Sequence, residues 1–141
     1  MFTPDQLENL VIYRLQLSND LALLLDNKGA ITRKDSRAAG TTRDITVSTL
    51  TLTDGDVQLA ILNVTIWVKD IEQKDGNMIR HVINRPIIDQ FVRGVVNALN
   101  GQKGYFWEKG NLYVENMGTA FNNPETREHF QNVRVRVRAH N

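Results

Sequence analysis

The sequence predicts a single α+β domain over residues 1–141, with a mainly antiparallel sheet and helices packed against it. Two stretches with helical spacing of apolar residues enclose a stretch rich in Val, Ile and Thr, and the last strand alternates strictly. The chain has 141 residues, 41% of them hydrophobic and 23% charged, which are ordinary globular values. Its net charge of +1 argues against a surface that is basic overall. The absence of cysteine excludes disulfides and cysteine nucleophiles.

The first expected element is a long N-terminal helix over residues 4–27. Thr3 can cap it, Pro4 suits the first helical position, and Gln6 can complete a capping box. Apolar residues then recur at mostly helical spacing: Leu7, Leu10, Val11, Leu17, Leu21, Leu24 and Leu25. Gly29 marks its end. The apolar surface is wider than one stripe, so the helix is either buried on one side or also meets another subunit.

Residues 29–43 form a polar, glycine-flanked stretch that is predicted to be a flexible basic loop. Its basic residues are Arg33, Lys34, Arg37 and Arg43. Two interpretations stay open, a solvated connector or a loop that contacts phosphate or a partner.

A β-hairpin is expected over residues 45–68, with its turn at Asp54-Gly55. That turn would place Leu52 opposite Val57 and Leu50 opposite Leu59. These four apolar residues share one phase, whereas the apolar residues farther from the turn occupy the opposite phase. We therefore expect a protruding hairpin whose outer half forms a subunit interface, with strong sheet twist or a second local cluster as the alternative.

After a crossing loop over residues 70–83, a second helix is expected over residues 85–100, packed on the sheet. Pro86 suits its start, its apolar residues follow a 3.6-residue period, and Asn100-Gly101 ends it. A second hairpin is expected to turn at Lys109-Gly110, with Trp107 beside Leu112. Its aromatic residues serve either cross-strand packing or, alternatively, base stacking.

The C-terminal stretch alternates between Val and Arg. Val133, Val135, Val137 and Ala139 would face the core, and Arg134, Arg136 and Arg138 would form a row on the other face. Three like charges need an opposite charge nearby. The candidates are Glu108 or Glu115 in the same chain, an acidic surface on a neighbouring protein, or nucleic-acid phosphate. The balanced net charge favours a protein partner over nucleic acid.

No catalytic motif is evident, because His81, His129 and His140 are scattered without metal-ligand spacing. Asp54-Gly55-Asp56 suits a turn better than a calcium loop. We therefore expect no catalytic residue, no cofactor and no metal. The chain shows no secretion signal or membrane-spanning run, so we expect a cytoplasmic protein without membrane contact.

The segments Asp44 to Val68, Arg85 to Leu99 and Val133 to Arg138 together carry a resemblance at the level of topology. Their order resembles that of the tail-terminator and head–tail completion (neck) proteins of tailed bacteriophages. The resemblance implies a non-enzymatic virion protein without cofactor, made in the bacterial cytoplasm. It implies self-association into a ring, commonly a hexamer, that contacts neighbouring tail-tube or neck proteins. Transient proximity to DNA is compatible with such a position, and whether DNA is contacted stays open. The alternative is a protein- or nucleic-acid-binding module that uses the 29–43 loop and the C-terminal Arg row.

Overall fold

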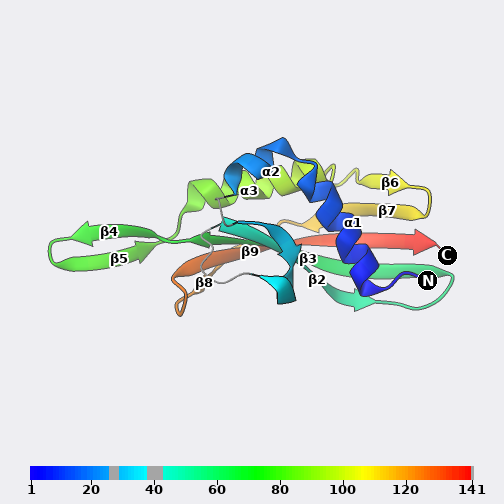
Figure 1. Ribbon diagram of the computed structural model, residues 1–141, viewed down its shortest axis with the longest axis horizontal. Helices are drawn as coiled ribbons and strands as arrows, with labels where there is room; N and C mark the ends of the chain where they lie inside the picture. Colours follow the sequence, from blue (N-terminus) through cyan, green and yellow to red (C-terminus); the bar gives the residue numbers. More distant parts are fainter. Residues whose placement is uncertain (26–28, 38–42, 141) are drawn as a thin grey trace.

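The computed structural model describes residues 1–25, 29–37 and 43–140, and it confirms the α+β class. The elements in chain order are α1 (Pro4–Gln16), α2 (Asn19–Leu24), β1 (Ile31–Arg33), the 3-10 helix η1 (Lys34–Ser36), β2 (Arg43–Leu52), β3 (Val57–Lys69), β4 (Ile71–Asp75), β5 (Met78–Val82), α3 (Arg85–Ala98), β6 (Tyr105–Trp107), β7 (Gly110–Asn116), β8 (Ala120–Asn123) and β9 (Glu128–His140). Figure 1 shows the helices gathered on one side of a long twisted sheet, with the β4–β5 ribbon projecting from one end.

The main sheet has seven strands in the order β1-β2-β3-β9-β7-β6, and β8 also pairs with β9. Its centre is the pair β3–β9, which is matched along its whole length from Val57–His140 to Lys69–Glu128. The pair β1–β2 is parallel, whereas the other pairs described in this sheet are antiparallel. The strands β4 and β5 form a separate two-stranded sheet.

The core lies between the sheet and the helices. Alternate residues of β3 and β9 are buried on the side of α3, whereas α1 lies on β1 and β2. For β9 this is the face that the strict alternation of the C-terminal stretch predicts. The fully buried residues include Leu62, Val64 and Ile66 on β3, Val133, Val135 and Val137 on β9, and Phe91 and Val95 on α3. The second helix is confirmed within two residues of its expected ends. Asn100 and Gly101 follow it with positive φ.

The expected single helix over residues 4–27 is wrong, because the structure has two helices there. The predicted capping box is present: the Gln6 amide donates to the Thr3 hydroxyl at 3.2 Å. The first helix ends at Gln16, and the hydroxyl of Ser18 then caps α2 by accepting from the Leu21 amide at 3.2 Å. Residues 26–28, where the expected end falls, lie outside the described residues.

The 45–68 hairpin turns where expected, but it lies in the middle of the sheet and does not protrude. Leu52 is paired with Ala60 and Val47 with Val64, with a β-bulge between Thr49 and Thr51. Along β3 the buried side chains keep one phase, so the apolar Val57 and Leu59 lie on the exposed face near the turn, as their phase predicts. On β2, Leu50 is also exposed, but Leu52 packs against the core, which corrects its expected phase. A bulge in β2 alone shifts its pattern.

The bulge is held by a carboxylate from α1. Glu8 accepts hydrogen bonds from the Thr49 amide at 3.1 Å and from the Thr49 hydroxyl at 2.6 Å. Glu8 thus supplies hydrogen-bond partners next to the bulge, where the regular pairing between the strands is interrupted.

The ribbon that does protrude is β4–β5, where the sequence suggested a crossing loop. Ile71 pairs with Val82 at its base and Asp75 with Met78 at its tip. Gly76 and Asn77 make the two-residue turn, and Gly76 has a φ of +64°.

The second hairpin is also shifted by two residues from its expected register, since Tyr105 lies opposite Leu112 and Trp107 opposite Gly110. Gly110 is needed as a strand residue, because a Cβ there would lie 2.0 Å from the Arg138 carbonyl oxygen. Tyr105 and Trp107 pack against the core.

Candidate interaction surfaces

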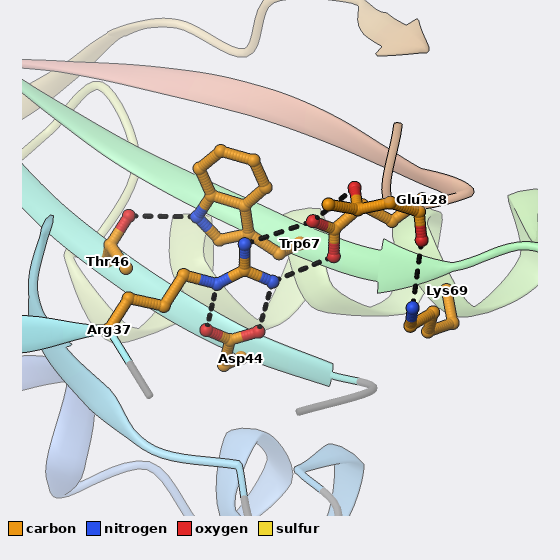
Figure 2. A network of polar contacts seen from close by, with 7 residues as sticks. Arg37, Asp44, Thr46, Trp67, Lys69 and Glu128 are labelled. Carbon is orange, nitrogen blue, oxygen red and sulfur yellow. Dashed lines mark hydrogen bonds and ion pairs between the residues drawn. The ribbon is translucent and has the colours of Figure 1, made fainter. Parts of the chain in front are cut away.

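Arg37, one of the four basic-loop candidates, is clamped between two buried carboxylates (Figure 2). Its Nε lies 2.6 Å from Asp44 Oδ2, and its Nη2 lies 2.7 Å from Glu128 Oε2. The carboxylate side chains of Asp44 and Glu128 are only 4% and 3% exposed. The guanidinium also stacks over Trp67, with its carbon 4.1 Å from the ring centroid. The clamp therefore ties residue 37 to strands β2, β3 and β9.

The contacts of the clamp favour the charged forms of Arg37 and Glu128. Burial alone would lower the pKa of Arg37, but the hydrogen bonds to Glu128 and Asp44 raise it above its ordinary value. Burial would raise the pKa of Glu128, but hydrogen bonds from Arg37 and Thr126 lower it below its ordinary value. Lys69 donates to the Thr126 carbonyl at 2.8 Å and completes the network in Figure 2. This geometry gives Arg37 a structural role.

The other basic-loop candidates are less engaged. Arg33 lies 3.5 Å from Asp5 and donates to the Asn9 side chain at 2.9 Å. Lys34 is exposed in η1, and Arg43 starts β2. Residues 38–42 of the loop lie outside the described residues. Arg33 and Arg37 thus already have partners within the chain.

The four apolar candidates on β2 and β3 divide into two groups. Three of them, Leu50, Val57 and Leu59, are exposed, with exposed fractions between 39% and 47%. Leu52 is half-buried and packs against the core. The exposed three lie near the β2–β3 turn, at the end of the molecule opposite the β4–β5 ribbon (Figure 1).

The C-terminal arginines lie on the sheet face away from the helices, as the alternation predicts. Arg136 donates to Glu115 at 2.6 Å, and this hydrogen bond raises the pKa of Arg136. Glu115 is one of the two partners that the sequence offered. Arg134 and Arg138 are exposed, and neither guanidinium makes an ion pair or hydrogen bond within the part of the chain that the structure describes.

The ribbon β4–β5 is a surface that the sequence interpretation missed. Every residue from 71 to 80 is exposed, including Met78 at 69% and Ile79 at 56%. At its base, His81 contacts Arg127 at 2.8 Å and Asp70 contacts His129 at 2.5 Å. The sequence held one signal for this ribbon, the two-residue Gly76-Asn77 turn.

Residues 1–25, 29–37 and 43–140 contain no group of three or more His, Asp or Glu side chains placed to hold a metal ion. Within the same ranges, no helix has the length and apolar character to cross a membrane.

No protein-family model matches this sequence, and no curated protein matches it.

Proposed function

We propose that this protein is a non-enzymatic assembly subunit, whose copies join into a ring at the tail–neck junction of a phage-like particle. The observation that carries the proposal is the exposed β4–β5 ribbon. A two-stranded ribbon alone in water is marginally stable at best. This one also exposes Ile71, Met78 and Ile79. Contact with another molecule would bury these side chains and give the ribbon the support that its own chain lacks.

The position of the ribbon supports a head-to-tail arrangement. It projects from one end of the long axis, and the β2–β3 turn lies at the other end (Figure 1). Leu50, Val57 and Leu59 provide exposed aliphatic surface near that turn. A contact between two different ends of the same chain is heterologous, and heterologous contacts produce closed rings when the rotation closes. The resemblance to tail-terminator and neck proteins supports a ring, with six copies as the first expectation.

The arrangement of charge favours assembly over a nucleic-acid-binding function of the 29–43 loop. Arg33 and Arg37 are paired with carboxylates of their own chain. To bind either arginine, a phosphate would have to displace these carboxylates. For Arg37, both of the carboxylates to be displaced are buried.

The experiment is to shorten the ribbon and measure the mass in solution. Because Ile71 and Val82 are cross-strand partners, an Asn-Gly turn can replace residues 72–81 and close the chain at the same place. We expect the full chain to elute as a discrete oligomer in size-exclusion chromatography with light scattering, and the shortened chain as a monomer. Leu23→Ser is the matched control, since Leu23 is 84% exposed on α2.

The control should keep the wild-type mass. A shortened chain that is folded by circular dichroism and still forms the same oligomer would contradict the proposal. So would a full chain that remains monomeric at high micromolar concentration.

A further inference from the structure

A second surface lies on the sheet face that the helices leave uncovered, next to the exposed Leu59, which is the cross-strand partner of Arg138. Val133, Val135 and Val137 on β9 point into the core, so the arginines between them point away from it. We call Arg134, Arg136 and Arg138 the arginine row. It lies on a central strand, since β9 pairs with β3 on one side and β7 on the other.

The three arginines differ in whether an acidic side chain neutralises their charge. Arg136, in the middle, is neutralised by Glu115 at 2.6 Å. Arg134 and Arg138, at the ends, have no acidic partner within the described residues. They are four positions apart along the strand, which is about 13 Å. The row therefore offers two available cations with a neutral pair between them.

Amide side chains lie beside both available cations. Arg138 is the cross-strand partner of Asn111, and Arg134 is the partner of Asn63 and Asn116. At the Arg134 end the surface is hollowed into a pocket of about 330 Å³, lined also by Phe121 and Asn132. A guanidinium with neighbouring amides is suited to receive a carboxylate, which accepts several hydrogen bonds at once.

We infer that the arginine row binds an extended acidic segment of a partner protein, with carboxylates at positions i and i+4 and an uncharged residue at i+2. In a strand, residues i, i+2 and i+4 lie on one face and repeat with the same rise as β9. Two β layers stack with their strands within about 30° of each other, so the two periods stay matched over this short distance. The acidic residues then meet Arg134 and Arg138, and the uncharged residue meets the Arg136–Glu115 pair.

The same pattern disfavours a nucleic-acid strand. A polyanion carries charge at every repeat, so it would place a phosphate against Glu115 in the middle of the row. A segment with an uncharged residue at i+2 avoids that repulsion.

The test uses two labelled nine-residue peptides of alternating Thr and Val. One carries Glu at its third and seventh positions, and the other carries Glu at its third and sixth positions, which fall on opposite faces of a strand. Fluorescence anisotropy measures binding to the full chain, with a thymidine oligonucleotide as a third probe. Arg134→Gln and Arg138→Gln are the variants, and Arg93→Gln on α3 is the control, since α3 packs on the other face of the sheet.

We expect the third-and-seventh peptide to bind, and each row variant to weaken it about fivefold, as for an exposed ion pair. The double variant should weaken it about 25-fold, because the two sites are far enough apart to act independently. Arg93→Gln should leave the affinity unchanged, and added salt should weaken it. The melting temperature should stay unchanged, because both row residues are exposed.

Three results would overturn the inference. One is equal affinity for the two peptides, which would remove the spacing argument. Another is tighter binding of the oligonucleotide, with loss in the same two variants, which would assign the row to nucleic acid. The third is no measurable binding of either peptide at low salt.

Discussion

Removing the charge of Arg37 tests the clamp that joins residue 37 to three strands. Arg37→Met keeps an aliphatic chain over Trp67 but removes the guanidinium that pairs with the buried carboxylates of Asp44 and Glu128. Breaking a buried ion pair by removing one partner costs about 3–5 kcal/mol. We expect a loss of unfolding free energy at the lower end of this range, about 3 kcal/mol, because the Arg37 side chain is itself 21% exposed. For a domain of this size the melting temperature should fall by about 10 °C.

The pH dependence sharpens this prediction. Because the folded-state pKa of Glu128 lies below its unfolded value, its pairing stabilises the fold fully above the unfolded value of about 4.3. That stabilisation is lost as the pH falls through the folded-state pKa. The difference in unfolding free energy between wild type and Arg37→Met should therefore be full at pH 7 and shrink below about pH 4.5.

Thermal denaturation followed by circular dichroism at pH 7 gives the change in melting temperature, and urea denaturation at pH 7 and at pH 4 gives the pH dependence of the unfolding free energy. Arg33→Met is the matched control, since Arg33 pairs with the exposed Asp5 at 3.5 Å and reaches Glu8 only at the long distance of 3.9 Å, so its loss should cost about 1 kcal/mol. An Arg37→Met protein that melts within 2–3 °C of wild type, like the control, would refute the structural role of the clamp.

Two glycines give further predictions, each tested by thermal denaturation. Gly110→Ala should destabilise the fold by about 3 kcal/mol or more, because its Cβ would lie 2.0 Å from the Arg138 carbonyl oxygen and separate β7 from β9; unchanged melting would contradict this pairing. Gly94→Ala should cost about 1–3 kcal/mol, because its Cβ would lie 2.6 Å from Leu21 Cδ2 at the contact of α2 with α3. Adding Leu21→Val should restore part of that loss, and no recovery would place the strain elsewhere.

The sequence predicts the elements that bury one face, because burial of one face leaves a regular spacing of apolar residues. The alternation of β9 and the period of α3 are read directly from the residues, because each buries one face against the other. The helix break at Ser18 was missed because Leu17 and Leu21 continue the apolar spacing across it. Spacing alone does not show that the Ser18 hydroxyl starts a new helix there.

The shape of the interaction surfaces was harder to predict. The ribbon β4–β5 has no fully buried residue and therefore no apolar alternation, and only its Gly76-Asn77 turn marks it in the sequence. The β2 bulge depends on Glu8, 41 residues away in sequence, and no local pattern contains that contact. The arginine row was predicted as a row, but its division into one paired and two available cations follows from the position of Glu115 on the neighbouring strand.

The central claim is that copies of this chain assemble head to tail, and its most direct test is the mass of the full chain across a concentration series. Sedimentation velocity distinguishes the possibilities. A closed ring gives one species above the 16.1 kDa monomer, at a fixed multiple of that mass that does not grow with concentration. We expect that result, with a sixfold multiple as the first expectation. A single species at 16.1 kDa over the whole series would contradict the account.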